Sequence, residues 1–401
     1  MENNQNQQNT IYNKCGLANI GNTCYMNSVL QILVHNKQLR QYFVDKLFKQ
    51  TLSNNISRSL ANEPRDNEYE NKVIFVSTHT LTIQFYRLLN EMMNCSHIAP
   101  ITFKQILESK NDTFLGHSQN DSHELISYLL DTLHEETKCE INISIDGLPK
   151  SYHFINTELE KFNQRLSDIK NDNDKNTLMK EYQIFVNSNQ IEMIEHAGIT
   201  HWANHIKKNF SIVSKHFTGL KHSLIHCQEC SMQSHSFEIF LTMPLEIPLD
   251  KEKITIFDCL DLFTRNEVMD GENKYACPSC NKNSVAKKKI CLWNMPDVVI
   301  IQFNRFHYDH VKQRIDKLNQ LITYDLEMDF GKYMYSNRKS RIYELTGVIH
   351  HYGVFGGGHY VSFNKVGNEW FQFNDSHISQ VEDINKQIIT ESSYVLVYSA
   401  K

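Results

Sequence analysis

The sequence lacks three features that mark particular classes of protein. No apolar run approaches the length needed to span a bilayer. Basic residues are not in excess, because 41 Lys and Arg stand against 46 Asp and Glu, and the formal net charge of −5 at pH 7 argues against a nucleic-acid partner. Residues 1–13 are polar and lack the basic end and apolar centre of a signal peptide. We therefore expect a protein of the cytoplasm and/or nucleus that binds neither membranes nor nucleic acid.

The composition is that of a folded chain with a large core. Of the 401 residues, 40% are hydrophobic and 22% are charged, and no internal repeat is visible. This length suits one elaborated domain or two to three simple ones. The ten cysteines are expected to be thiols or metal ligands, because a reducing compartment disfavours disulfides.

Hydrophobic periodicity predicts a helical first third and a β-rich second half, and so an α+β fold. Helical patterns cover residues 24–35, 80–94, 102–109 and 118–138, and the last is the clearest. Residues 1–13 are predicted to be a disordered leader, residues 53–72 a surface loop, and residues 141–214 a partly helical insertion with flexible parts. Beyond Phe217, β-type runs at 237–241, 289–293, 298–303, 343–350, 359–364, 370–374 and 394–398 predict a mostly antiparallel sheet.

Cys24 lies where a loop is expected to become a helix. Residues 19–23 are small and turn-forming, and the apolar residues Met26, Val29, Leu30 and Leu33 follow at the spacing of one helix face. A thiol at a helix N-terminus meets the positive end of the helix dipole and unpaired amide hydrogens, and both favour the thiolate. This is the position that suits a catalytic cysteine. The alternative is that Cys24 is one more small buried residue, as free cysteines usually are.

Two Cys-x-x-Cys pairs have the spacing of a zinc site. The pairs Cys227 with Cys230 and Cys277 with Cys280 each present two sulfur atoms about one tight turn apart. Together they supply four ligands for a structural Zn²⁺ that would pin the ends of two hairpins. The alternatives are a redox-active pair, two disulfides or free thiols.

A nucleophilic cysteine needs a histidine base and a third group that orients it. Among the histidines, His359 follows three glycines and opens a β-type run, and the next run ends at Asn374 and Asp375. An adjacent antiparallel strand would bring Asn374 or Asp375 beside His359. The order Cys, His, Asn/Asp matches papain-type chemistry, although a half-buried structural histidine and a plain turn explain the same residues.

These residues together resemble the ubiquitin-specific proteases, a class of cysteine deubiquitinating enzymes. The resemblance rests on the run from Gly16 through Cys24 to Ser28, on Gly357-Gly358-His359-Tyr360, and on Gln119, Asp121 and Glu124, which match a Gln-x-Asp-x-x-Glu helix. The two Cys-x-x-Cys pairs, residues 296–306, 351–353 and 370–375 complete the set, in the family's order from residue 14 to residue 398.

The resemblance implies a papain-like fold described as a hand, in a single catalytic domain over residues 14–400. A helical thumb over about 14–215 would include the insertion at 141–214, zinc-binding fingers would cover about 216–295 and a β-sheet palm about 296–400. It implies a monomeric enzyme that acts on ubiquitin and ubiquitinated proteins. Cys24 would be the nucleophile, His359 its base, Asn374 the third member, Asp375 the neighbouring acid and Asn19 the donor to the oxyanion. The resemblance also implies that Gln119, Asp121, Glu124 and Tyr360 meet the ubiquitin tail.

Several positions depart from the family pattern and leave alternatives open. Asn374 stands where Asp is also used, so the relative roles of Asn374 and Asp375 are open; Asn304 replaces the usual Lys and His123 the usual Gln. The insertion at 141–214 is either a docking surface or a solvated excursion. A protease for a ubiquitin-like modifier and a non-catalytic ubiquitin-binding scaffold remain as alternative functions.

Overall fold

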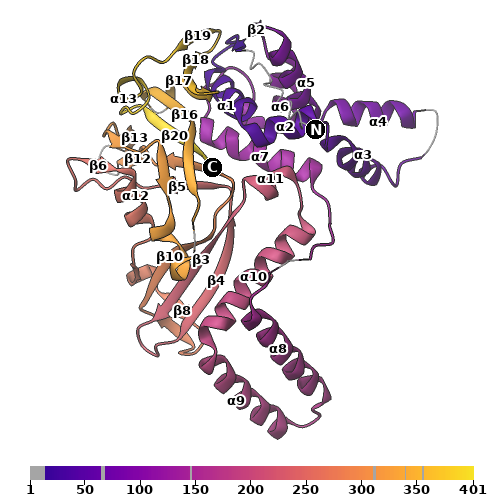
Figure 1. Cartoon of the computed structure of the whole chain (residues 1–401), viewed down its shortest axis with the longest axis vertical. Helices are drawn as coiled ribbons and strands as arrows, with labels where there is room; N and C mark the ends of the chain where they lie inside the picture. The colour runs from indigo at the N-terminus through magenta and orange to yellow at the C-terminus, as the bar shows by residue number, and fades with distance from the viewer. Residues whose placement is uncertain (1–13, 65–67, 145–146, 310–312, 339, 355) are drawn as a thin grey trace, which may run out of the picture.

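The computed structural model describes residues 14–401 except 65–67, 145–146, 310–312, 339 and 355. The predicted disordered leader at 1–13 lies outside these residues. Helices dominate the first half of the chain and strands the second (Figure 1). The predicted α+β class is confirmed.

A bundle of helices forms the N-terminal part, with α1 at its centre. Nearly every side chain of α1 is buried, because it packs against α7 on one side and against strand β17 of the main sheet on the other. The apolar stripe of α7 is confirmed, since Leu125, Ile126, Leu129, Leu130 and Leu133 are all buried. The elements are β1 (Gly16–Leu17), α1 (Cys24–His35), α2 (Lys37–Val44), α3 (Phe48–Ser59), α4 (Tyr69–Thr78), α5 (Leu81–Asn94), β2 (His97–Ile98), α6 (Ile101–Lys110), η1 (Asp112–Phe114) and α7 (Ser122–Thr137).

The surface loop predicted at 53–72 is too long, because only the described residues between α3 and α4 are without helix. This stretch contains the second half of α3 and the start of α4. Leu52 and Ile56 lie four residues apart and are both buried, so α3 has a narrow apolar edge that faces the core. The many polar residues occupy its wide exposed face, and their number hid the helical period.

The main sheet carries the C-terminal strands in the order β19-β18-β17-β16-β20-β11-β5, with β15 beside β16. All neighbours are antiparallel except β11 and β5, which confirms the predicted antiparallel character. The strands are β5 (Thr242–Leu245), β11 (Val298–Phe303), β15 (Glu327–Asp329), β16 (Ile342–Val354), β17 (Gly357–Val366), β18 (Glu369–Asn374), β19 (His377–Gln380) and β20 (Ser393–Ala400).

A second sheet, in the order β4-β3-β10-β7, extends away from the main sheet (Figure 1). Its strands are β3 (Gly219–Cys227), β4 (Gln233–Phe240), β7 (Glu267–Met269) and β10 (Ala286–Asn294), and the small hairpin of β8 (Tyr275–Cys277) and β9 (Lys282–Ser284) lies beyond them. The remaining elements are β6 (Ile254–Thr255), α12 (Ile256–Phe263), η2 (Gly271–Asn273), β12 (Phe306–Asp309), β13 (Arg314–Lys317), β14 (Ile322–Thr323), η3 (Gly331–Tyr333), η4 (Tyr335–Asn337) and α13 (Ile384–Gln387).

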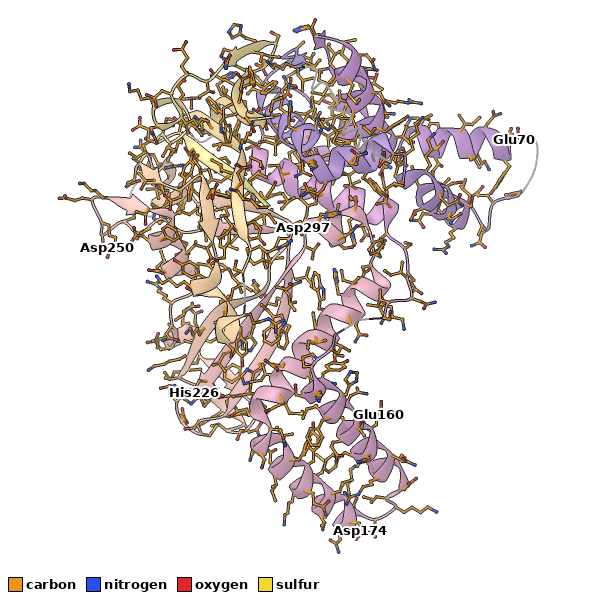
Figure 2. All side chains as sticks on the ribbon, viewed as in Figure 1. Glu70, Glu160, Asp174, His226, Asp250 and Asp297 are labelled. Atoms are coloured by element: carbon orange, nitrogen blue, oxygen red, sulfur yellow. The ribbon has the colours of Figure 1, made fainter. Side chains whose placement is uncertain are left out.

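The insertion is more helical than predicted. It contains α8 (Lys150–Asp168), α9 (Asp172–Ser188) and α10 (Gln190–Lys208), and the short α11 (Ile212–His216) returns the chain to the second sheet. We call α8, α9 and α10 together the arm. Figure 2 shows Glu160 and Asp174 on this arm, away from the main sheet. Cys139 and Phe210 pair as an antiparallel bridge that closes the root of the arm.

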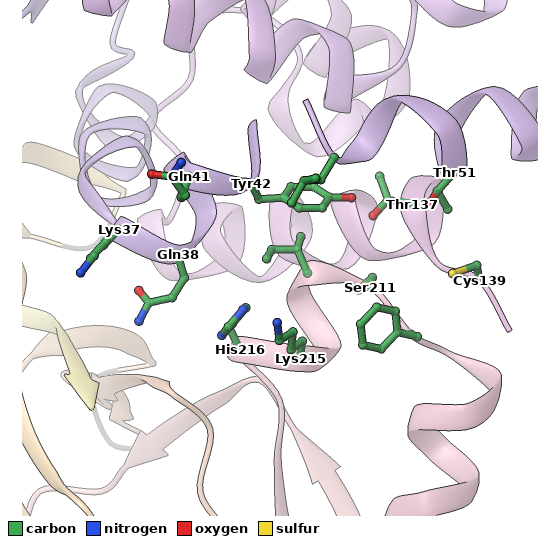
Figure 3. Close-up of a pocket in the computed structure, with 13 residues that line it drawn as sticks. Lys37, Gln38, Gln41, Tyr42, Thr51, Thr137, Cys139, Ser211, Lys215 and His216 are labelled. Carbon is green, nitrogen blue, oxygen red and sulfur yellow. The ribbon is translucent and has the colours of Figure 1, made fainter. Parts of the chain in front are cut away.

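Helix α10 packs on the second sheet through a glycine. A Cβ atom at Gly198 would overlap the Trp293 ring of β10, so the helix backbone lies directly on that ring. Helix α10 is therefore seated on the sheet, whereas α8 and α9 are mostly exposed. The root of the arm also forms one wall of a cavity of about 520 Å³, together with Tyr42 of α2 and Thr137 of α7 (Figure 3).

Candidate active site

The loop before α1 is organised by the side chain of Asn19. Its Oδ1 atom accepts hydrogen bonds from the backbone N–H groups of Gly21 (3.2 Å) and Thr23 (3.1 Å). This arrangement closes the turn and delivers Cys24 as the first residue of α1. The thiol is buried at the helix N-terminus, where the first-turn amides have no partner within the helix. The predicted position of Cys24 at a loop-to-helix junction is confirmed.

His359 lies near the start of β17, and Asn374 is the last residue of the neighbouring strand β18. The Nε2 atom of His359 is 2.6 Å from Oδ1 of Asn374. Because a carbonyl oxygen only accepts, Nε2–H donates, and Nδ1 is left for the thiol of Cys24. Hydrogen bonding with Cys24 raises the pKa of His359 to about 9, with a smaller increase from Asn374 and opposition from burial.

Asp375 contacts the other half of the site. Its Oδ2 accepts from Nδ2 of Asn19 (2.9 Å) and its Oδ1 from Nδ2 of Asn27 (2.8 Å). The backbone of Asp375 has a φ of 50°, in the left-handed region, which turns this side chain away from the strand that holds Asn374. Asn374 thus lies against the imidazole and Asp375 against the loop of Asn19.

The residues expected to meet a substrate tail have different surroundings. Gln119 donates a hydrogen bond from Nε2 to the backbone oxygen of Gly358, next to His359. Asp121 caps α7 through the N–H groups of His123 (2.7 Å) and Glu124 (3.1 Å), and its second oxygen accepts from the hydroxyl of Tyr394 (2.5 Å). The Glu124 side chain is exposed.

Tyr360 follows His359 on β17 and is buried. Its ring lies 4.6 Å from that of His351 and 6.2 Å from that of Tyr394, measured between centroids. A Cβ atom at Gly358 would overlap the backbone oxygen of Tyr352 and crowd the His351 ring. The chain beside His359 is therefore packed too closely for any residue but glycine at this point.

The four cysteines of the two Cys-x-x-Cys pairs converge at the far end of the second sheet. Their sulfur atoms all lie within 4.8 Å of one another, and Cys227 is 3.8 Å from Cys280 and Cys230 is 3.6 Å from Cys277. Tetrahedral Zn²⁺ with Zn–S bonds of about 2.3 Å holds sulfur atoms about 3.8 Å apart. All four are free thiols, so the donor set and its spacing fit one Zn²⁺ ion.

A model of the family described as ubiquitin carboxyl-terminal hydrolase matches residues 15–398. The chain belongs to this family. Its members are cysteine-type deubiquitinating peptidases, so the resemblance seen around Cys24 and His359 is confirmed.

Relatives include proteins of a virus and of animals. A protein named as a probable ubiquitin carboxyl-terminal hydrolase of Acanthamoeba polyphaga mimivirus is 27% identical over 96% of this chain and 89% of its own length. Ubiquitin carboxyl-terminal hydrolase 2 of Bos taurus is 28% identical over 96% of this chain, and the human protein is 26% identical over the same share. The chain spans 54% of the length of each of these two mammalian proteins.

Solved structures share the fold. Ubp8 in the SAGA DUB module bound to monoubiquitin superposes with a TM-score of 0.66 and 22% identity, over 98% of this chain and 70% of that chain. The same module bound to ubiquitin aldehyde gives a TM-score of 0.66 over 97% of this chain and 70% of that one. The expected fold of the ubiquitin carboxyl-terminal hydrolase family, with its papain-like core and cysteine-bearing β extension, is confirmed.

Sequence reasoning missed several residues that this hydrolase fold gathers at the site. Asn27 is buried on α1 and binds Asp375, and its Nδ2 also reaches the backbone oxygens of Leu17 and Ala18 (3.2 Å each). The signal for Asn27 in the sequence was its place three residues after Cys24, which puts a polar side chain on the buried side of the helix. His351 belongs to one of the runs that resemble the family, but its contact with Tyr360, like that of Tyr394, depends on strand pairing and has no local signal.

Proposed function

We propose that this chain is a thiol-dependent deubiquitinase that hydrolyses the isopeptide or peptide bond after the C-terminal glycine of ubiquitin. The observation that carries the proposal is the contact of Cys24 with His359, whose far nitrogen binds Asn374, beside an Asn19 amide held by Asp375. Family membership supports the same reaction. Residues 14–400 are proposed to act as one catalytic domain and as a monomer, in the cytoplasm and/or nucleus. None of the helices in the described part of the chain has the length and apolarity to cross a membrane.

The reaction begins with a proton transfer from Cys24 to His359. Because its pKa is raised to about 9, the imidazole of His359 is a base strong enough to take this proton as the sulfur attacks. The sulfur attacks the carbonyl carbon of the scissile bond, and the electron pair of the C=O bond moves to the oxygen. Asn19 Nδ2 has two hydrogens, one bound to Asp375, so the other is available to the negative oxygen, with the backbone N–H of Cys24 as a second donor.

The acyl-enzyme forms and is then hydrolysed. As the tetrahedral intermediate collapses, protonated His359 donates its proton to the departing lysine amine, and the C–N bond breaks. Neutral His359 next removes a proton from water, which attacks the thioester, and the proton returns to Cys24 as the thiol leaves. Asn374 keeps the imidazole in the tautomer that both steps need.

Four residues are proposed to hold the substrate tail. Glu124 offers an exposed carboxylate to an arginine of the tail, while Asp121, already used as a helix cap, contributes negative charge and orients the start of α7. Gln119 binds the backbone oxygen of Gly358, and Tyr360, the residue after His359 on β17, is proposed to line the channel of the tail. The glycines before His359 are proposed to line a channel that admits a tail ending in glycines and excludes side chains.

We also propose that Cys227, Cys230, Cys277 and Cys280 bind one structural Zn²⁺. The ion would hold the β8–β9 hairpin to the end of β3. It takes no part in the chemistry at Cys24.

Turnover of ubiquitin carrying a C-terminal fluorogenic amide tests the function. We expect hydrolysis by the wild-type chain and none by Cys24→Ala. Faster hydrolysis of the same amide on a ubiquitin-like modifier would change the substrate, and no hydrolysis of any such amide would support the non-catalytic scaffold instead.

A further inference from the structure

Helix α6 carries an ion pair of which the lysine is buried and the glutamate half-buried. The Lys104 side chain is 7% exposed and that of Glu108 is 24% exposed, and Nζ of Lys104 is 2.7 Å from Oε1 of Glu108. Lysine is almost never buried unless its three N–H groups are bonded. The other donors of Lys104 reach the backbone oxygens of Phe114 (2.5 Å) and Gly116 (3.0 Å), and Glu108 accepts the backbone N–H of Gly116 (3.0 Å).

The pair therefore satisfies three backbone groups of one turn. Gly116 has a φ of 76°, which points its N–H and C=O groups toward α6 and not along the chain. No helix or strand supports residues 115–121, so these bonds hold the segment where secondary structure does not.

The held segment touches both halves of the active site. The backbone oxygen of His117 accepts a hydrogen bond from Nδ2 of Asn22 (2.8 Å), in the loop that carries Asn19. Two residues later, Gln119 binds the backbone oxygen of Gly358, next to His359. Residues 117–119 thus contact both the loop before Cys24 and strand β17, which carries His359.

The aromatic contacts of the segment reinforce this path. The ring of Phe114 stacks on that of Tyr25 at 6.3 Å and 18°, and Tyr25 directly follows Cys24. Asn120 donates to the hydroxyl of the same tyrosine (3.2 Å). Displacement of the segment would therefore be felt at Asn22, within the loop, and at Tyr25, directly after Cys24.

We propose that Lys104 and Glu108 are positioning residues, which fix the oxyanion loop and the base strand through the segment at 114–119. The inference rests on the proposed hydrolase function for its kinetic consequences, but the bracing itself is a property of the folded chain. The pair acts through His117 and Asn22 and touches no reacting atom.

The test uses an apolar replacement of the whole pair. A buried pair replaced by apolar residues of similar volume often leaves a protein as stable as before, whereas breaking it leaves one unpaired charge. Lys104→Met with Glu108→Leu should therefore fold but lose the three backbone bonds at 114–116. The matched control is Lys138→Met with Glu135→Leu. These two residues form an exposed ion pair at the end of α7, in which the side chain of Lys138 is 36% exposed and that of Glu135 is 54% exposed.

Amide hydrogen exchange measures whether these contacts hold the loop, and it does not depend on catalytic activity. We expect faster exchange at both 114–119 and 18–23 in the α6 double variant and unchanged exchange in the control. Unchanged exchange at 18–23 in the α6 variant would overturn the proposal. This readout stands even if the chain hydrolyses no ubiquitin amide, so failure of the bracing and failure of the proposed function are distinguishable.

A kinetic cycle separates positioning from stability. The α6 double variant should lower kcat on the ubiquitin amide about tenfold or more with little change in KM, as expected for a lost transition-state interaction. Asn22→Ala removes the link to His117 and leaves that of Gln119, so the loss of kcat in the combined variant should be smaller than the two separate losses added together. Fully additive losses, or a kcat that stays at the wild-type value in the α6 variant, would contradict the proposal.

Discussion

The carboxylate of Asp375 holds the side-chain amide of Asn19, with 2.9 Å between Oδ2 and Nδ2. Asn374, one residue earlier, holds the imidazole of His359 at 2.6 Å. The two neighbouring residues thus face different parts of the reaction. Asn374 orients the base, and Asp375 orients the donor to the oxyanion.

Asp375→Ala and Asn374→Ala should therefore have separable effects. Asp375→Ala is expected to lower kcat on the ubiquitin amide about tenfold to hundredfold, because the Asn19 donor loses its orientation. Alkylation of Cys24 by iodoacetamide, which needs the thiolate but no oxyanion donor, should change little. Asn374→Ala should slow alkylation as well as turnover. Equal losses of alkylation in both variants would contradict this division.

The pKa of His359 gives a prediction for titration. The structure raises it from 6.5 to about 9, chiefly through the hydrogen bond with Cys24. Imidazole NMR titration should find it near that value in the wild-type chain and lower in Cys24→Ala. A pKa that is the same in both chains would show that the thiol is not its main cause.

The same shift predicts how stability depends on pH. Because the folded pKa lies above the unfolded value, the stabilisation is fully present below about pH 6.5 and is lost as pH rises through about 9. The unfolding midpoint of the wild-type chain should therefore fall relative to that of Cys24→Ala across this range. A constant difference between the two midpoints would argue against a raised pKa of His359 in contact with Cys24.

Metal analysis tests the cysteine cluster. About one zinc per chain should co-purify and be lost in Cys277→Ser with Cys280→Ser, since four thiolates form a closed structural site. Ubiquitin binding should weaken more than Cys24 alkylation does, because the metal would order the second sheet and not the active site. Cys291→Ser, which changes a cysteine outside the cluster, should keep its zinc. A wild-type chain without zinc would remove the site.

Gly198 tests the seating of the insertion. Gly198→Val should force α10 away from Trp293 and lower the free energy of unfolding by about 1–3 kcal/mol, as overpacking usually does. Limited proteolysis should then cut between α8 and α10 more readily. Asn204→Val, on an exposed position of the same helix, is the control, and equal proteolysis of both variants would mean that α10 does not depend on this contact.

Parts of the site that depend on adjacent residues were readable from the sequence. The turn-forming residues before Cys24, the glycines before His359 and the two Cys-x-x-Cys pairs each carry their signal within a few positions. Strands such as β11 and β18 were also predicted closely, because β-branched or aromatic residues are concentrated in them.

Other features depend on contacts that no local pattern records. Asp375 and Asn19 lie 356 positions apart, and their contact needs a left-handed backbone at Asp375. Lys104 looks like a surface lysine of an amphipathic helix and is buried only because residues 111–117 fold over it. The helical character of 53–72 and of the insertion was underestimated because polar residues outnumber the narrow apolar edges of those helices.

The most direct test of the account is the reaction of the chain with ubiquitin bearing an electrophilic C-terminus, read by intact mass. We predict one adduct of one ubiquitin per chain, attached at Cys24 and absent from Cys24→Ala, whereas Cys15→Ala should still form it. Absence of the adduct from the wild-type chain, or its survival in Cys24→Ala, would contradict the assignment of Cys24 as the nucleophile of a deubiquitinase.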